Sequence, residues 1–172
     1  IIDDVAVGRS EIGILYLSEH NEAVLSKLIN KNDLNFEELY VAKPHVFISN
    51  NHPLANKEEI TIQDLMLYPY LVFEQGKHNS FYFSEEFLSS LEFSKNIMVR
   101  DRATLFNLLI GLNGFTVCSG IIDTELNGEN IISKPLDSDC SMRIGILIRK
   151  NSVLSRYGVS YLNVLKNYLS ID

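Results

Sequence analysis

Residues 96–119 read NIMVRDRATLFNLLIGLNGFTVCS, and this stretch decides the fold. Residues 96–100 predict a strand, and residues 103–112 (ATLFNLLIGL) are apolar enough to predict a buried helix. The Asn-Gly pair at 113–114 predicts the end of that helix, because both residues readily adopt the left-handed backbone found at helix C-termini. Residues 115–119 predict another buried strand, so the stretch is interpreted as a strand–helix–strand unit.

The segments before this stretch alternate between helix and strand in the same way. A helix is predicted at 2–7, a buried strand at 11–17 and a helix at 21–32. An extended stretch follows at 36–49, and Pro44 is expected to bend it or to place it at a sheet edge. This alternation predicts an α/β protein with parallel sheets covered on both faces, and ligands at the carboxyl ends of the strands.

The remaining segments extend the pattern to the end of the chain. Thr61 is expected to cap a short helix that ends before Pro69, with Asp64 completing a variant of the capping box. The other predicted elements are strands at 70–74, 130–136 and 142–149, a turn at 127–128, and helices at 81–91 and 154–169. Two helix-rich lobes joined by crossing strands fit the bend at Pro44 and the late strand at 142–149.

Composition and charge narrow the class of protein. The chain has 172 residues, of which 46% are hydrophobic and 22% are charged, as in soluble globular proteins. No apolar run approaches the roughly 18 to 20 residues that a membrane span requires, so no membrane role is expected. The formal net charge is -7 without a cluster of Lys and Arg, so this chain alone is not expected to bind nucleic acid.

The two cysteines and the start of the chain bear on the cellular compartment. Cys118 lies in an apolar run, where a buried reduced thiol is the commonest state, and Cys140 is the second cysteine. Reduced thiols fit a cytoplasmic protein, with a redox pair as the alternative. The chain begins at Ile1 rather than Met and shows no leader pattern, so we expect a fragment without a signal peptide.

The sequence offers no pattern typical of catalysis or metal binding. No metal-ligand spacing such as HxxxH occurs among the four histidines, His20, His45, His52 and His78. A GxSxG motif is also missing, and Lys77 between Glu74 and Glu85 fits isolated surface charges better than an acid/base set. We therefore expect no metal, no cofactor and no catalytic residues, and predict that the chain is not an enzyme.

The order and spacing of several motifs resemble the effector-binding domain of LysR-type transcriptional regulators over essentially the whole chain. The motifs are Gly8–Ile14 (GRSEIGI), His52–Ala55 (HPLA), Ile60–Leu65 (ITIQDL), Thr104–Leu109 with Gly111 and Gly114, and Leu154–Leu169. The resemblance implies the periplasmic-binding-protein-like, type 2 fold, with two α/β lobes and an interlobe cleft. It also implies a first lobe at 1–44 plus 140–172 and a second lobe at 45–139.

The same resemblance implies partners. Family members open this domain with a strand, a helix and a strand before the point where this chain begins, and carry a winged helix-turn-helix before that. DNA binding is therefore expected only through an N-terminal winged helix-turn-helix that is absent from this chain. Effector domains of the family pair side by side, so we expect a dimer or tetramer, with 81–91 as the best candidate face.

Thr104 is the leading candidate for contact with a ligand. It follows the strand at 96–100 and opens the helix at 103–112, so its hydroxyl and nearby free N–H groups could face an anion. The structural alternative is that Asp101 or Thr104 only caps the helix. The resemblance, in which this turn lines the cleft, favours the ligand contact.

The other candidate ligand-binding residues also lie at strand ends or helix starts. Tyr16 and Ser18 share one side of the sheet edge at the end of the first strand, although Tyr16 could equally be a core aromatic. Ser119 and Gly120 end a later strand. The loop residues Gly76, Asn79 and Ser80 could donate to a carboxylate or lie exposed to solvent.

The predicted function is a sensor in which a small anionic metabolite enters the cleft and shifts the population of an oligomeric regulator. The sequence EQGKHNSFYFSEE at 74–86, followed by DRATLFNLLIGLNG at 101–114, resembles that of regulators of sulfur-amino-acid metabolism. Those regulators sense precursors of the O-acetylserine type. Alternatives are a solute-binding protein of the same fold, which would need a signal peptide or lipobox cysteine, and an enzyme built on this fold.

Overall fold

The structure, a computed structural model, describes residues 1–19, 21–74 and 93–169. The chain forms two compact units. Unit 1 comprises Ile1–Ala42 and Met142–Asp172, and unit 2 comprises Lys43–Ser141. The chain therefore passes between the units twice, once on each side of the central segment.

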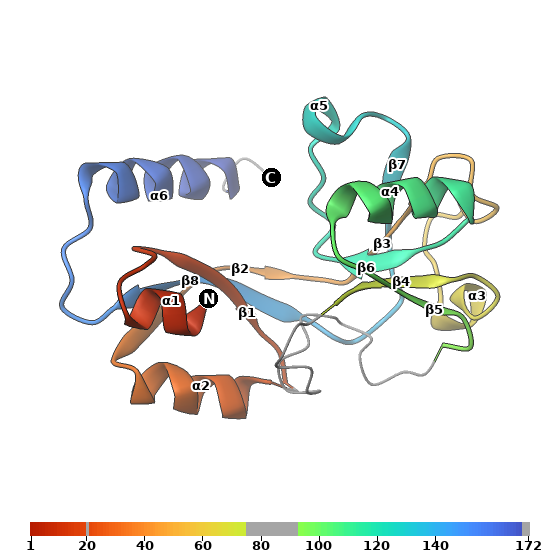
Figure 1. Cartoon of the computed structure of the whole chain (residues 1–172). Helices are drawn as coiled ribbons and strands as arrows, with labels where there is room; N and C mark the ends of the chain where they lie inside the picture. The colour runs from red at the N-terminus through yellow and green to blue at the C-terminus, as the bar shows by residue number, and fades with distance from the viewer. Residues whose placement is uncertain (20, 75–92, 170–172) are drawn as a thin grey trace. The chain divides into compact units, whose positions relative to one another are not determined.

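Unit 1 is built on a three-stranded sheet. Strand β8 (Met142–Arg149) lies between β1 (Gly13–Leu17) and β2 (Leu34–Ala42) and runs antiparallel to both. Three helices accompany this sheet: α1 (Ile2–Ala6), α2 (Glu22–Lys31) and α6 (Arg156–Leu169). Figure 1 shows α2 and α6 on opposite sides of it.

Close packing in unit 1 depends on glycine at two strand positions. A Cβ atom at Gly13 would come within 2.6 Å of Ile1 and 3.1 Å of Val5, so only a glycine lets α1 approach β1 this closely. At Gly145 in β8, a Cβ atom would come within 2.5 Å of the Phe36 ring. The strands thus carry glycine where a helix or an aromatic ring takes the space of a side chain.

Unit 2 contains a second antiparallel sheet and a parallel strand pair. Strand β3 (His45–Ser49) lies between β6 (Thr116–Cys118) and β7 (Ile131–Pro135), antiparallel to both. Strands β4 (Tyr70–Phe73) and β5 (Asn96–Val99) pair in parallel, and a parallel bridge joins Tyr70 to Phe115. The helices among the described residues of this unit are α3 (Ile62–Leu65), α4 (Arg102–Gly111) and α5 (Thr124–Asn127).

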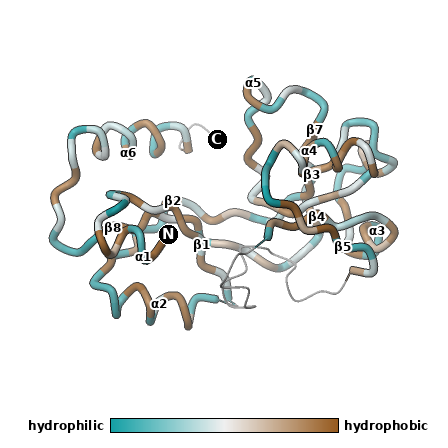
Figure 2. The backbone as a smooth tube through the Cα atoms, viewed as in Figure 1, coloured by the Kyte–Doolittle hydropathy of each residue, from teal (hydrophilic) through white to brown (hydrophobic). Residues whose placement is uncertain are grey.

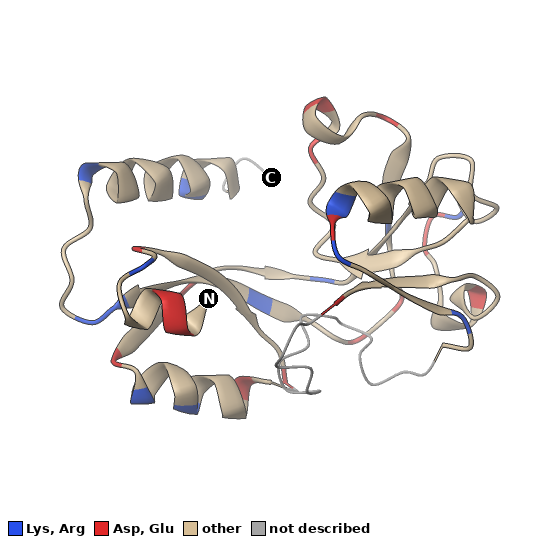
Figure 3. Cartoon of the chain, viewed as in Figure 1, with Lys and Arg blue, Asp and Glu red and all other residues tan. Residues whose placement is uncertain are grey.

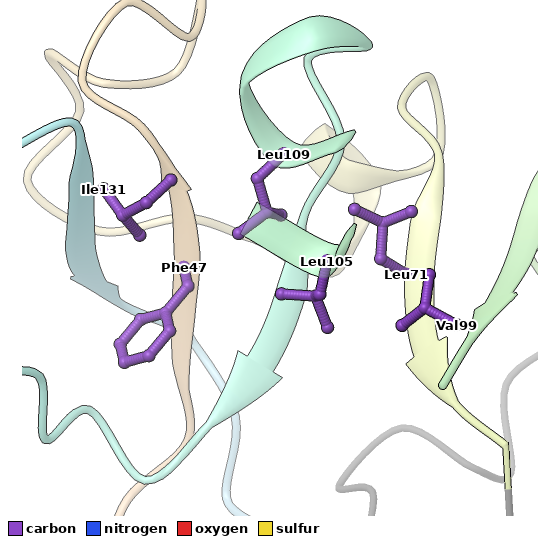
Figure 4. Close-up of a cluster of buried hydrophobic side chains, with 6 residues drawn as sticks. All are labelled: Phe47, Leu71, Val99, Leu105, Leu109 and Ile131. Carbon is purple, nitrogen blue, oxygen red and sulfur yellow. The ribbon is translucent and has the colours of Figure 1, made fainter. Parts of the chain in front are cut away.

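Helix α4 supplies the centre of the unit 2 core. Leu105 and Leu109 lie one turn apart on its buried face and meet apolar side chains from four strands. Figure 4 shows them with their partners, Phe47 of β3, Leu71 of β4, Val99 of β5 and Ile131 of β7. Much of β1, β3 and β4 is likewise hydrophobic in Figure 2.

The local predictions from sequence are largely confirmed. Pro44 separates β2 from β3, and Thr61 caps α3 in a reciprocal capping box with Asp64. Asn113 adopts the left-handed backbone, φ 48°, directly after α4. The predicted helix at 81–91 lies outside the described residues. The single-turn helix α5 was not predicted; Asp123 caps it, accepting a hydrogen bond of 3.1 Å from Leu126 N–H.

The predicted parallel sheets are wrong for most of the strand pairs. Among the strand pairs of the described residues, only β4 and β5 run in parallel, whereas the pairs made by β3 and by β8 are antiparallel. The reason is the double passage between units. Strand β2 leaves unit 1 and β8 re-enters it, while β3 enters unit 2 and β7 leads out of it, so the partners run in opposite directions.

Candidate functional site

The first turn of α4 is held by Asp101 and Thr104. Asp101 is the N-cap, with extended backbone, and its Oδ1 accepts the Thr104 N–H at 2.8 Å. The Thr104 hydroxyl donates to Asp101 Oδ2, also at 2.8 Å. These hydrogen bonds lower the pKa of the Asp101 carboxyl, because they stabilise its charged form. Asp101 therefore places a carboxylate of the protein itself at the positive end of α4.

Two arginines flank this turn. The Arg100 guanidinium donates to the Glu74 carboxylate, which follows β4, and this pair lowers the pKa of Glu74. The Arg102 guanidinium lies 5.2 Å from the centre of the Phe106 ring, one turn further along α4. The turn thus combines cationic groups with free hydrogen-bonding capacity at a helix N-terminus.

The end of β6 lies against the same core cluster. Cys118 packs on the cluster that contains Leu105 of α4, together with Phe106 and Ile122. Ser119 and Gly120, both partly buried, follow directly. The structure therefore brings the end of β6 and the first turns of α4 to one cluster within unit 2.

Gly120 is required by the backbone at this strand end. Its φ is +86°, a left-handed conformation that side chains disfavour. A Cβ atom there would also come within 2.6 Å of His45 Nδ1. Gly120 therefore packs its backbone against the His45 ring, which is a structural reason for glycine that strand-end reasoning did not predict.

Cys118 is a structural thiol, as predicted. Burial raises its pKa to about 12, so the thiol stays protonated near neutral pH and is a poor nucleophile. Its Sγ lies 3.7 Å from the His45 carbonyl oxygen. Cys118 and Cys140 are both free thiols.

In unit 1, Ser18 and Tyr16 lie where the sequence analysis placed them. Tyr16 is partly exposed on β1, opposite Ile144 of β8. The Ser18 backbone N–H donates to Asn21 Oδ1 at 2.8 Å, and its carbonyl accepts the Glu22 N–H at 2.9 Å. Asn21 is almost fully buried and shapes the turn between β1 and α2. Sequence reasoning included Asn21 in the helix predicted at 21–32 and missed its role in the turn, although Asn at the start of a helix is a turn signal.

The loop residues proposed as ligand contacts, Gly76, Asn79 and Ser80, lie outside the described residues. A ligand role for them stays a prediction, as it does for Thr104, Ser18, Tyr16, Ser119 and Gly120.

His52 is a buried polar residue that the sequence analysis considered as a metal ligand and as the first residue of the HPLA motif. Leu54 N–H donates to its Nδ1 at 3.1 Å, so the ring proton lies on Nε2, which donates to the Asn113 carbonyl at 3.0 Å. The ring also lies 4.4 Å, centre to centre, from the Tyr68 ring. His52 thereby ties the HPLA turn to the turn after α4, and burial lowers its pKa.

The described residues contain neither a group of metal ligands nor a membrane-spanning helix. Across residues 1–19, 21–74 and 93–169, no three His, Cys, Asp or Glu side chains are grouped to hold a metal ion. None of the helices in this part of the chain has the length and apolar character needed to cross a membrane. Figure 3 shows Lys and Arg distributed over many elements, interspersed with Asp and Glu.

Residues 1–169 match the family model of the LysR substrate binding domain, and the chain belongs to this family. Among curated proteins, it is 26% identical over 167 residues to the malolactic fermentation system transcriptional activator of Lactococcus lactis. That alignment covers 92% of this chain and 56% of the relative, so the chain spans about half the length of that regulator.

Solved structures of LysR-family regulators have the same fold. HinK from Pseudomonas aeruginosa superposes with a TM-score of 0.64 at 16% identity, covering 98% of this chain and 55% of HinK. The effector binding domain of QuiR, solved with shikimate, gives 0.64 at 18% identity, covering 98% of this chain and 76% of that domain. The OxyR regulatory domain from Pseudomonas aeruginosa gives a TM-score of 0.62 at 18% identity, covering 99% of this chain and 77% of that domain. The predicted periplasmic-binding-protein-like, type 2 fold is thus confirmed.

Proposed function

We propose that this chain is the effector-sensing part of a LysR-type transcriptional regulator, which binds a small organic anion and has no catalytic turnover. The observation that carries the proposal is the family match over residues 1–169. In this proposal, residues 1–44 with 140–172 form the first lobe, residues 45–139 form the second, and the effector binds in the cleft between them. The family match favours a regulator over a solute-binding protein of the same fold.

The first turn of α4 is the proposed anchor for the anion. A helix N-terminus attracts negative charge, and Thr104 offers a hydroxyl there. Asp101 already accepts both Thr104 hydrogen bonds, so an incoming carboxylate must take over the hydroxyl proton or bind beside Asp101. Arg102 of the same turn and the residues after β6, Ser119 and Gly120, are the proposed additional contacts from unit 2.

A relative of the same fold supports a small anion as the effector class. The effector binding domain of QuiR was solved in complex with shikimate, a small organic anion. Ser18 and Tyr16 are the proposed contacts from the first lobe, because both lie at the end of β1.

Two narrower effector classes follow from different observations. The likeness of 74–86 and 101–114 to regulators of sulfur-amino-acid metabolism supports a precursor of the O-acetylserine type. The relative from Lactococcus lactis is a malolactic fermentation activator, which supports a dicarboxylic or hydroxy acid instead.

In the whole regulator, effector binding would shift an equilibrium between two arrangements of a dimer or tetramer in the cytoplasm. DNA would be bound by a winged helix-turn-helix outside residues 1–172. This arrangement is consistent with a chain that spans about half of its curated relative.

Isothermal titration calorimetry of this chain with O-acetylserine, L-malate, L-lactate and shikimate tests the proposal. Saturable binding of one of these acids with a Kd of roughly 1 μM to 1 mM supports it and identifies the effector class. A chain that is folded by circular dichroism, binds none of the four acids and binds an uncharged solute instead contradicts the anionic effector.

A further inference from the structure

The first passage of the chain between the units is short and contains Lys43. The ladder of β2 with β8 ends at the pair Ala42 and Met142. On the unit 2 side, the Pro44 carbonyl already accepts the Leu136 N–H at 3.0 Å, next to the ladder of β3 with β7. Lys43 therefore lies between the two ladders, and its backbone torsions set the direction in which the chain enters β3.

His45 holds one of these torsions. Its Nδ1 lies 3.0 Å from the Lys43 carbonyl oxygen, and because a carbonyl only accepts, Nδ1 carries the ring proton and donates it. The direction of that carbonyl is set by the ψ torsion of Lys43. Pro44, between the two residues, has a nearly fixed φ and disfavours helical backbone at Lys43. The hydrogen bond from His45 thus fixes the freedom that Pro44 leaves.

The same imidazole ring packs on the backbone of Gly120. A Cβ atom at Gly120 would come within 2.6 Å of Nδ1 and 2.7 Å of Cγ of His45, so the Gly120 backbone lies against the part of the ring that donates to Lys43. Cys118 is the partner of His45 in the β3–β6 ladder, and its Sγ donates to the His45 carbonyl at 3.7 Å. A displacement of Gly120 toward the ring must therefore move Nδ1.

We propose that His45 couples the segment Ser119–Gly120 to Lys43, so that an effector bound at this segment changes the backbone where the chain passes between the units. This inference rests on the proposed function, in which Ser119 and Gly120 contact the effector. One ring makes both contacts, by packing on Gly120 and by its hydrogen bond to Lys43. The coupling is reciprocal, so a change at Lys43 also changes the effector affinity of the segment.

NMR of the Lys43 carbonyl carbon tests the coupling without an effector. When lysine is labelled with ¹³C at its carbonyl and proline with ¹⁵N, a carbonyl–nitrogen correlation spectrum shows only Lys–Pro bonds. This chain has two of them, at Lys43–Pro44 and Lys134–Pro135. Lys43→Arg removes the first signal and so assigns it. Loss of the hydrogen bond from His45 shifts this carbonyl signal upfield.

Gly120→Ala reproduces the displacement that a ligand at this segment would cause, because its Cβ atom enters the space of the His45 ring. We expect it to shift the Lys43 signal upfield by more than its linewidth. Gly128→Ala is the matched control, because Gly128 also has a positive φ, +71°, but nothing lies within 4 Å of its Cβ position. An unchanged Lys43 signal in Gly120→Ala, or equal shifts in both variants, overturns the proposal.

Two changes of His45 separate its two contacts. His45→Phe keeps a ring and removes the donor, whereas His45→Asn keeps an amide donor and removes the ring. In both backgrounds, adding Gly120→Ala should no longer shift the Lys43 signal. A shift as large as that seen with His45 present means that the effect reaches Lys43 by another route, and the coupling through His45 is then wrong.

Cys118→Ala takes the place of Gly120→Ala if circular dichroism shows that the latter does not fold. The Cys118 sulfur accepts the Gly120 N–H, so its removal releases the segment without placing new atoms against the ring. The Lys43 signal should move when His45 is present and stay in place in the His45→Phe background; any other result contradicts the coupling. None of these measurements uses an effector, so they fail or succeed independently of the calorimetric test of effector binding.

Discussion

At the scale of single residues, the same side chain could stabilise the fold or bind the ligand, and Thr104 is the clearest example. Asp101 is the N-cap of α4, and the Thr104 hydroxyl donates to the Asp101 carboxylate. The two alternatives of the sequence analysis thus differ in one measurable respect. A ligand contact changes affinity, whereas a helix-capping hydrogen bond changes the free energy of unfolding.

Replacing Thr104 with Val keeps the side-chain volume and removes the donor. We expect the affinity for the effector to fall about 5- to 150-fold, corresponding to roughly 1 to 3 kcal/mol. The backbone N–H of residue 104 still donates to Asp101, so the free energy of unfolding should fall by no more than about 1 kcal/mol. Calorimetric titration measures the affinity, and urea denaturation measures the free energy of unfolding.

Thr61→Val is the matched control, because the Thr61 hydroxyl also donates to an aspartate carboxylate, Asp64, in the first turn of α3, with threonine as the N-cap and aspartate at N3. It should lower the free energy of unfolding by roughly 0.5 to 2 kcal/mol and leave the affinity unchanged. If Thr104→Val also leaves the affinity unchanged, Thr104 has only a structural role.

His52 predicts a pH dependence of folding. Its pKa in the folded protein lies below the ordinary 6.5, first because of burial, and protonation of Nδ1 would break the hydrogen bond from Leu54 N–H. The unfolded state therefore binds the proton more readily. Stability is independent of this group above about pH 6.5, falls as the pH drops below that value, and levels off below the folded-state pKa.

The variant His52→Gln isolates this contribution, because Gln does not titrate. Urea denaturation between about pH 7.5 and about pH 5.5 should show a larger loss of stability for the natural protein than for the variant. Parallel pH profiles of the two proteins would show that the pKa of His52 in the folded protein is the ordinary one, which contradicts the prediction.

At the scale of elements, glycine positions show how closely strands and helices approach. Gly145→Ala in β8 places a Cβ atom within 2.5 Å of the Phe36 ring, so the free energy of unfolding should fall by roughly 1 to 3 kcal/mol. Gly111→Ala, at the end of α4, meets nothing within 4 Å and should stabilise by about 0.5 to 1 kcal/mol. Thermal melts of both variants should therefore shift in opposite directions.

Element types were predictable from local patterns, whereas strand direction was not. The capping box at Thr61 and Asp64 and the Asn113 turn follow from nearest neighbours in sequence. The antiparallel partners of β8 lie a hundred or more residues earlier in the chain, as in the pair Leu34 and Arg149. Such pairings depend on the route of the chain between units, which no local window contains.

At the scale of the whole molecule, the charge distribution predicts that residues 1–172 alone do not bind duplex DNA specifically. The net charge is -7, and the basic residues are distributed among acidic ones rather than gathered on one element. A gel-shift assay at about 0.15 M salt should show no complex with a Kd below about 1 μM. A sub-micromolar complex would mean that this chain itself carries a DNA-binding surface.

The sequence by itself determined the α/β class, the family and most of the element types, because hydrophobic period, caps and turn residues act over a few neighbouring positions. The end of β6, the first turn of α4 and the end of β1 could also be named as candidate contact positions from local order. Only the tertiary structure decided that Asp101 holds the Thr104 hydroxyl, that His52 joins two distant turns, and that Gly120 is needed against His45. Each of these depends on side chains that meet only after the strands have paired, and pairing over long separations is set by packing rather than by local propensity.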